Sequence, residues 1–338
     1  MPSMTEARTA PARTTTTGRF LEILDQPFYR LLVDLQDLIS FETARFWRSR
    51  GVKSIHLPVT TGSISSPMGL GSDSLPVQVT IAGLPVYLAD SMQFLLEYGC
   101  RLTPQGCYYI MPSFRGEQSD ATHLNEFFHS EAEIPGGLED VIAVADAYVR
   151  HLAAALLTDL AEPLRRSAAG SAHIERFLDT PSHRLSFDQA VDDLGADPAF
   201  FTFHDGWRTI TRAGEQKLMD RYGPGVWLTH NDTLAVPFYQ ATTDGGARAL
   251  NADFLLGPGE ILGCGERQLT AAGLRASLDL HQVDEDDYAW YVAMKEFHPQ
   301  RTSGFGLGVE RFAMWALGRS DIRDLQLAER SHGTVTAP

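Results

Sequence analysis

The chain has 338 residues, 43% of them hydrophobic, which suffices for one large globular domain. Its net charge of −15 argues against a protein that binds nucleic acid chiefly through a basic face. The three cysteines fit neither a disulfide framework nor a zinc motif, and no apolar run approaches the roughly 18 residues that cross a membrane. We therefore expect a cytoplasmic protein without a membrane span.

The first half of the chain predicts a tail, a long helix and several strands. Residues 1–19 are rich in Thr, Ala, Pro and Arg and are predicted to be disordered, whereas residues 20–338 are predicted to form one domain. Apolar residues recur at helical spacing from Phe20 to Arg50, with an interruption at Pro27. The following patterns predict strands at 54–59, 77–81, 86–89, 107–111 and 127–134, and helices at 91–98 and 138–157.

The second half begins with a mostly helical stretch, 161–223, that includes helices at 187–194 and 214–222. Strands are then predicted at 226–228, 236–242, 247–255 and 259–267, followed by a helix at 284–295 and a strand that runs into a helix over 304–317. Short connections between neighbouring strands predict an α+β fold, with a mixed or antiparallel sheet flanked by helices.

Glycines alternate with apolar residues in the segment from Ser303 to Arg311. In a strand, this alternation places Gly304, Gly306 and Gly308 on one face, which a ligand or another element can approach closely. Arg311 follows at the start of a predicted helix, a position suited to a polyphosphate. The local pattern favours ligand binding and close packing of protein about equally.

A second polar segment forms a predicted hairpin that carries Arg115, Glu117, His123 and Phe127. An arginine can neutralise a phosphate, a carboxylate can accept from an exocyclic amine, and an aromatic ring can stack on a base. The alternative is a surface hairpin with a local ion pair, which this segment taken alone favours.

The two segments together resemble motifs 2 and 3 of class II aminoacyl-tRNA synthetases. The closest resemblance is to the asparaginyl/aspartyl branch, and in particular to truncated asparaginyl-type paralogues of the archaeal asparagine synthetase kind. It spans about Phe20 to Arg330, and Pro58 matches the motif 1 proline of the family's dimer interface. The resemblance implies a class II antiparallel sheet flanked by helices, and a homodimer.

The resemblance also implies an ATP site with two catalytic arginines. Arg115 would hold the α-phosphate and the substrate carboxylate, while Arg311 would meet the γ-phosphate and cover the adenine. The other ATP contacts that it implies are Glu117, His123, Phe127, Gly308 and Glu310. The contacts that it implies for the amino acid are Ser91, Gln93, Tyr239, Arg267 and Gly306. Asp253 and Glu260 match the residues that bind magnesium.

Several departures from the family concern the acid substrate, and one is Val236-Pro237 where the family usually has a basic residue. The loop that follows Pro58 lacks the acidic residue that would hold an α-amino group, and only Asp73 is near. Leu95 and Leu96 stand where aspartyl enzymes carry a lysine. We therefore expect a pocket more apolar than an aspartate pocket, in which a buried carboxylate depends mainly on Arg267.

The leading hypothesis is an ATP- and magnesium-dependent ligase that converts a carboxylic acid into an acyl-adenylate and then an amide. Aspartate or a related or modified amino acid would be the acid, and ammonia or another amine the nucleophile. The family's anticodon-binding domain has no room before the first helix, which argues against tRNA as a partner. The alternatives are acyl transfer to tRNA, a carrier protein or a protein lysine, and a regulatory paralogue that only binds ATP or an amino acid.

Overall fold

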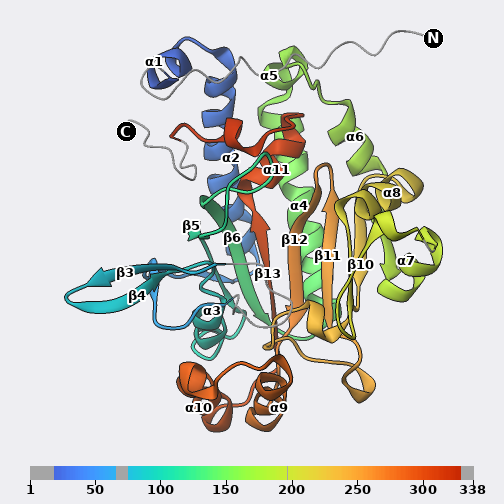
Figure 1. Ribbon diagram of the computed structural model, residues 1–338. Helices are drawn as coiled ribbons and strands as arrows, with labels where there is room; N and C mark the ends of the chain where they lie inside the picture. Colours follow the sequence, from blue (N-terminus) through green and yellow to red (C-terminus); the bar gives the residue numbers. More distant parts are fainter. Residues whose placement is uncertain (1–18, 66–74, 196, 329–338) are drawn as a thin grey trace.

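The computed structural model describes residues 19–65, 75–195 and 197–328. The predicted N-terminal tail, except its last residue, and Asp73 lie outside these residues. An eight-stranded sheet forms the centre, in the order β1-β5-β6-β13-β12-β11-β10-β7 (Figure 1). Its interior pairs, from β5 to β11 and on to β10, are antiparallel, whereas β1 pairs with β5 and β7 with β10 in parallel. The predicted α+β fold with a mixed sheet is confirmed.

The strands of this sheet are β1 Lys53–Ser54, β5 Cys107–Phe114, β6 Glu126–Pro135, β7 His183–Ser186, β10 Val226–Thr229, β11 Asn251–Leu256, β12 Gly259–Glu266 and β13 Thr302–Gly308. Two small sheets contain β2 Thr60–Thr61, β3 Val77–Ile81 and β4 Leu84–Leu88, and β8 Phe201–Phe203 with β9 Arg208–Ile210. The helices are α1 Arg19–Leu24, α2 Pro27–Ser49, α3 Gln93–Cys100, α4 Leu138–Asp159, α5 Ala161–Arg166, α6 Ala172–Asp179, α7 Phe187–Leu194, α8 Arg212–Tyr222, α9 Ala271–His281, α10 Ala289–Phe297 and α11 Val309–Ala316.

Helices α2 and α4 pack together, and α4 lies against β12 and β13 (Figure 1). Trp47 of α2 and Tyr148 of α4 are fully buried, and both rings contact Phe305 of β13. The Tyr148 hydroxyl lies 2.6 Å from Thr43 Oγ1 and 2.8 Å from Ser130 Oγ, so its polar end is hydrogen-bonded within the core. Helices α2 and α4 thereby cover one face of the central sheet.

By length and composition, α4 is apolar enough to span a membrane. This contradicts the expectation that no apolar run approaches that length. Val141, Ala145, Val149 and Leu152 are fully buried in the cluster that also contains the residues of β12 and β13. We conclude that α4 is apolar because it is the core helix of the sheet.

Most predicted elements are present, and the β3–β4 hairpin turns at Ala82 and Gly83, both in the left-handed region. The strand predicted at 236–242 is wrong. Phe238 and Tyr239, which would point to opposite faces of a strand, are both buried in one cluster with Phe94 and residues of α9 and α10. The segment is irregular, with isolated bridges at Gln240 and Thr242.

Two other expectations also differ from the structure. The strand predicted at 54–59 is reduced to β1, because the chain leaves the edge of the sheet after Ile55, whose N–H donates to the Tyr108 carbonyl. Helix α9 was not predicted; its N-cap is Thr270, whose hydroxyl accepts from the Gly273 N–H.

Candidate active site

The predicted site residues line one cavity of about 640 Å³. Its floor is the face of the sheet opposite α4: Phe305 and Leu307 point into the core, so the glycines that alternate with them face the other way. Every residue that the sequence assigned to ATP, amino acid or metal belongs to the lining: Ser91, Gln93, Arg115, Glu117, His123, Phe127, Tyr239, Asp253, Glu260, Arg267, Gly306, Gly308, Glu310 and Arg311. Their roles remain predictions.

The glycine strand is packed against protein over part of its length. Gly304 pairs with Glu133 of β6, and Gly306 pairs with Glu131. A Cβ on Gly304 would lie 1.9 Å from Glu133 Oε2, and one on Gly306 would lie 2.9 Å from Glu131 Oε1. At Gly308 the nearest atom would be Arg311 Cβ, 3.7 Å away. Close packing of protein therefore explains Gly304 and Gly306, and the open face is at Gly308.

Arg115 follows β5 and is positioned by the hairpin. Its N–H donates to the Asn125 carbonyl at 2.9 Å, and Asn125 Nδ2 donates in return to the Arg115 carbonyl at 2.9 Å. The guanidinium carbon lies 5.5 Å from the centre of the Phe127 ring, and Nη1 lies 4.0 Å from Glu117 Oε1. Arg115 Nε is buried without a hydrogen-bond partner. Because an unpaired buried donor is costly, this guanidinium is arranged to meet an anion in the cavity.

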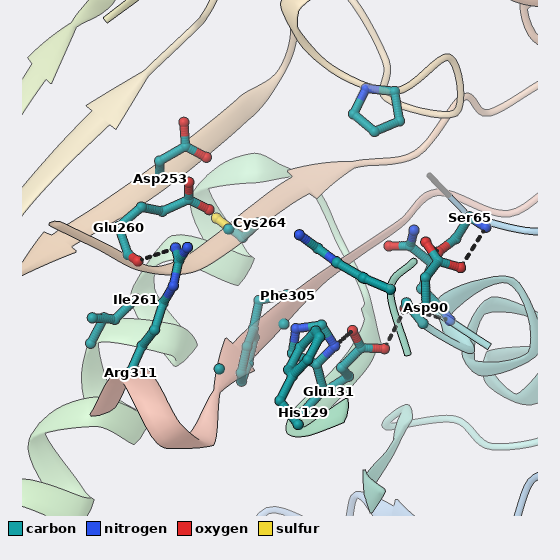
Figure 2. A pocket seen from close by; sticks show the side chains of 18 of the residues that line it. Ser65, Asp90, His129, Glu131, Asp253, Glu260, Ile261, Cys264, Phe305 and Arg311 are labelled. Atoms are coloured by element: carbon teal, nitrogen blue, oxygen red, sulfur yellow. Dashed lines mark hydrogen bonds and ion pairs between the residues drawn. The ribbon is translucent and has the colours of Figure 1, made fainter. Parts of the chain in front are cut away.

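Arg311 enters the same cavity from the first turn of α11. Its Nη1 donates to the Glu260 carbonyl at 2.7 Å, which holds the side chain across the open face at Gly308 (Figure 2). Burial, Arg115 and Arg311 together lower the pKa of His129 to about 3, so both cations act on this one ring. The imidazole is therefore neutral, and two arginines from distant segments lie around it.

Asp253 of β11 and Glu260 of β12 meet above Gly263. A Cβ on Gly263 would lie 3.1 Å from Glu260 Oε1 and 3.6 Å from Asp253 Oδ1. Burial and the charge of Glu260 raise the pKa of Asp253 well above its usual value, and the same two causes raise that of Glu215 to about 7. Asp253 and Glu260, two carboxylates that lie this close together, suit a divalent cation.

In the described part of the chain, no three His, Cys, Asp or Glu side chains are arranged to hold a metal ion. Two carboxylates without a full protein cage fit magnesium, which keeps waters and takes phosphate oxygens as ligands. The donor set at Asp253 and Glu260 therefore fits the predicted metal.

Three other predicted ATP contacts are engaged with protein. Glu310 is buried and accepts from the Phe128 N–H at 3.0 Å and from Gln326 Nε2 at 3.3 Å, which ties α11 to β6. Glu117 Oε2 accepts from the Leu75 N–H at 3.2 Å. His123 Nδ1 lies 3.1 Å from Asp120 Oδ1 at the exposed rim of the cavity.

The other end of the cavity contains a buried ion pair. Arg267 Nε and Nη2 donate to the Glu133 carboxylate at 2.8–3.1 Å, and both side chains are almost inaccessible. Although burial alone would lower it, the Glu133 charge raises the pKa of Arg267. Arg267, which was predicted to receive a substrate carboxylate, is therefore already neutralised by Glu133.

Glu131 lies beside this pair on β6. Its carboxylate accepts from Ser91 Oγ at 2.6 Å and from the Tyr109 hydroxyl, and Oε1 lies 3.2 Å from His129 Nδ1 (Figure 2). Burial raises its pKa to about 7 in spite of the hydroxyl donors. Gln93 is hydrogen-bonded to Tyr239, whose ring centre lies 5.3 Å from the Arg267 guanidinium.

The acid pocket is not made apolar by Leu95 and Leu96, contrary to the expectation, although Val236 and Pro237 do line it. Leu96 is fully buried in a separate cluster with Met92, Cys100 and Cys107, and neither it nor Leu95 lines the cavity. Asp90 and Glu131 line it instead, and the apolar part of the wall is the segment from Ala235 to Pro237. The packing of α3, which sequence spacing does not reveal, turns the leucines away from the cavity.

Comparison with known proteins assigns the family. The model of the tRNA synthetases class II (D, K and N) matches residues 12–328. The chain belongs to this family. Its members are ATP-dependent ligases, so the prediction of a ligase from the asparaginyl/aspartyl branch is confirmed.

Two relatives show the degree of likeness. The asparagine–tRNA ligase of Syntrophobacter fumaroxidans is 27% identical over 88% of this chain and 69% of its own length. The asparagine–tRNA ligase of Lactococcus lactis subsp. cremoris is 26% identical over 87% of this chain and 66% of its own length. The chain thus spans about two thirds of the length of these relatives.

Solved structures show the same fold. Asparaginyl-tRNA synthetase from Pyrococcus horikoshii, complexed with asparaginyl-adenylate, superimposes with a TM-score of 0.85 at 22% identity, over 94% of this chain and 72% of that chain. A putative aspartyl-tRNA synthetase from Leishmania major Friedlin gives a TM-score of 0.80 at 18% identity, over 98% and 71%. The class II synthetase architecture is therefore confirmed, whereas these names give no support to the expectation that tRNA is not a partner.

Within this class II site, the side chains that were not assigned from the sequence include Asp90, Glu131 and Glu133. Glu131 and Glu133 alternate on β6 opposite Gly306 and Gly304. That alternation, next to a strand with alternating glycines, is a signal that two carboxylates share the bare face. Asp90 gave no such signal, because its partner Ser65 lies 25 residues away in the chain.

Proposed function

We propose that this chain activates an amino acid with ATP and forms an enzyme-bound aminoacyl-adenylate with release of pyrophosphate. The observation that carries the proposal is the convergence of Arg115 and Arg311 on one cavity, close to the paired carboxylates of Asp253 and Glu260. The family supports the same first step.

The chemistry requires charge neutralisation and alignment. A carboxylate oxygen forms a bond to the α-phosphorus while the bond from that phosphorus to the bridging oxygen of pyrophosphate breaks. Arg115, with its unpaired Nε, would hold the α-phosphate, and Arg311 would hold the terminal phosphate. Magnesium, when bound at Asp253 and Glu260, would supply additional positive charge to the phosphates.

For the second step, we propose transfer of the acyl group to tRNA, because the relatives are asparagine–tRNA ligases. Attack by ammonia or another amine, with an asparagine synthetase-like outcome, is the second candidate. The observation in its favour is the net charge of −15, since a polyanionic partner meets general repulsion. The full set of charged groups around the cavity speaks against a purely regulatory binding protein.

Pyrophosphate exchange tests the first step, with L-asparagine, L-aspartate and a panel of other amino acids. We expect ATP formation from labelled pyrophosphate with at least one acid; absence of exchange with every acid, in a folded protein that binds ATP, contradicts the proposal. Adding tRNA or ammonium to the same reaction then separates the acceptors. Acid-stable label on tRNA supports acyl transfer only if mild alkali releases it, whereas a free amide supports the second candidate.

The cytoplasmic location and the homodimer expected from the family also remain proposals. Sedimentation at micromolar concentration measures the oligomeric state directly, and a monomer under conditions that support exchange contradicts the dimer.

A further inference from the structure

Two carboxyl groups lie in the wall at the acid end of the cavity. Asp90 and Glu131 both line it, and Asp90 acts electrostatically on Glu131. Arg267 is the cation that bears on Glu131 there, but Glu133 matches its charge through contacts of 2.8–3.1 Å. Carboxyl groups in the wall of a largely buried cavity are complementary to a positive group, so a ligand that carries one is favoured at this end.

Asp90 is held in a fixed orientation at the wall of the cavity. The Ser65 N–H donates to Oδ1 at 3.0 Å, and Ser65 Oγ donates to Oδ2 at 2.9 Å (Figure 2). Asp90 is 5% exposed, so this carboxylate is held within the fold rather than on the surface. A carboxylate whose two oxygens are both oriented loses little freedom when it binds a ligand.

The sheet places Asp90 next to Arg115. The Phe114 N–H donates to the Ala89 carbonyl at 2.9 Å, which pairs the residue before Arg115 with the residue before Asp90. The His129 ring connects the two as well, because it is hydrogen-bonded to the backbone of Asp90 and lies in the field of Arg115. A carboxylate and a guanidinium on neighbouring positions are complementary to the ammonium and carboxylate of an α-amino acid, which are separated by one carbon atom.

We propose that Asp90 is a specificity residue that binds the α-ammonium group of the substrate, with Glu131 closing the same site, while the substrate carboxylate meets Arg115. This rests on the proposed function and names its substrate class: an α-amino acid with an uncharged side chain, because the charge of Arg267 is already matched by Glu133. In the described part of the loop after Pro58, residues 59–65, there is no acidic residue, so Asp90 supplies the carboxylate from the end of β4 and the loop supplies Ser65 to orient it.

The test is calorimetric titration of the full chain, in the presence of a non-hydrolysable ATP analogue. The probes are L-asparagine and L-aspartate, each paired with the same acid without its amino group, succinamate and succinate. Wild-type protein is expected to bind L-asparagine best and at least about 10-fold better than succinamate, since a hydrogen bond to a charged group is worth that much or more. Asp90→Asn is expected to reduce this preference at least 5-fold while leaving binding of the ATP analogue unchanged.

Two further variants make the result interpretable. Asp159→Asn removes an exposed carboxylate at the end of α4 and is expected to match wild type. Ser65→Ala keeps the Asp90 charge but removes one of its orienting donors, and is expected to give a smaller loss of the amine preference. If Asp90→Asn does not fold, the amine preference of Ser65→Ala is compared with that of wild type instead.

Three outcomes overturn the inference: no amine preference in the wild type, an undiminished preference in both variants, or no binding of any acid. Pyrophosphate exchange, measured in parallel, separates this from the proposed function. Exchange without an amine preference leaves adenylation standing and removes the role of Asp90. A different result is that the wild type prefers the amino acids, that this preference is lost in Asp90→Asn, and that no pyrophosphate exchange occurs. That result supports the role of Asp90 and contradicts adenylation.

Discussion

The Arg267–Glu133 pair is a residue-level feature with a large expected energetic effect. Both side chains are buried, so removing one charge leaves the other without its partner in a poorly hydrated site. Buried pairs broken in this way typically cost about 3–5 kcal/mol, even where the intact pair contributes little net stability.

Glu133→Gln is therefore expected to lower the free energy of unfolding by about 3 kcal/mol, measured by urea denaturation. Glu139→Gln is the matched control, because Glu139 is 72% exposed and its pair with Arg184 is worth at most about 1 kcal/mol. In Glu133→Gln the charge of Arg267 is no longer neutralised by Glu133. The affinity of this variant for L-aspartate relative to L-asparagine is therefore expected to rise. An unchanged ratio would mean that Arg267 does not contact the substrate side chain.

Arg311→Ala is expected to reduce pyrophosphate exchange by at least 100-fold, because the phosphates lose a cation that is already in position before the reaction. Thermal unfolding should change little, since the single hydrogen bond from Arg311 to the Glu260 carbonyl is replaceable by water. Arg166→Ala, at an exposed arginine on α5, serves as the control. Normal exchange in Arg311→Ala would contradict the assignment of this residue.

At the level of elements, β13 combines two different requirements for glycine. Gly304 has no room for a side chain, because a Cβ would lie 2.6 Å from the Ala132 carbonyl oxygen as well as against Glu133. Gly308 has room, and its φ of −69° is accessible to any residue.

Gly304→Ala is therefore expected to destabilise the protein by about 1–3 kcal/mol, the usual cost of overpacking, with a lower urea midpoint. Gly308→Ala is expected to keep the stability of wild type within about 0.5 kcal/mol. A loss of ATP binding in Gly308→Ala would then indicate that ATP lies against the strand at Gly308. Equal stability of the two variants would show that the strand relaxes around Gly304.

Elements with a clear period could be predicted from the sequence, and those governed by distant contacts could not. Helix α4 has an apolar period over many turns, and α7 has a capping box at Ser186, so both were located closely. In contrast, β7 has four residues with a mixed pattern and forms only because β10 pairs beside it. The segment 236–242 has a strand-like composition that packing with α9 and α10 overrides.

The site was predictable where motif residues form the proposed phosphate contacts and not where protein groups neutralise one another. Arg115 and Arg311 stand in recognisable segments and do line one cavity. The ion pair of Arg267 with Glu133 depends on the register between strands. The orientation of Asp90 depends on its hydrogen bonds to Ser65 in a distant loop. No single segment of the sequence contains either fact.

For the whole molecule, several buried carboxyl groups make stability depend on pH. The pKa values of Glu131, Glu215 and Glu310 are each raised to about 7, chiefly by burial. Between about pH 4.5 and 7, the unfolded chain has released these protons while the folded protein keeps them. The unfolded state thus binds fewer protons, and the free energy of unfolding falls as pH rises through this window.

Glu215→Gln is expected to remove part of this dependence, because glutamine does not ionise. The variant should be more stable than wild type by about 1–3 kcal/mol at pH 8 and equal to it near pH 4.5, in urea titrations at both values. Asp220→Asn, an exposed change on the same helix α8, should show no such difference. A gain of equal size at both pH values would mean that packing, not ionisation, is responsible.

The position of β13 has a consequence for biosynthesis. The strand that joins β6 to β12 is the last of the sheet to leave the ribosome, although it lies near its middle. Until residues 302–308 emerge, β6 and β12 each present an unpaired edge, and such edges pair readily with other chains. A nascent chain that has not yet exposed β13 thus holds two partial sheets, and its need for chaperones should peak just before residues 302–308 emerge.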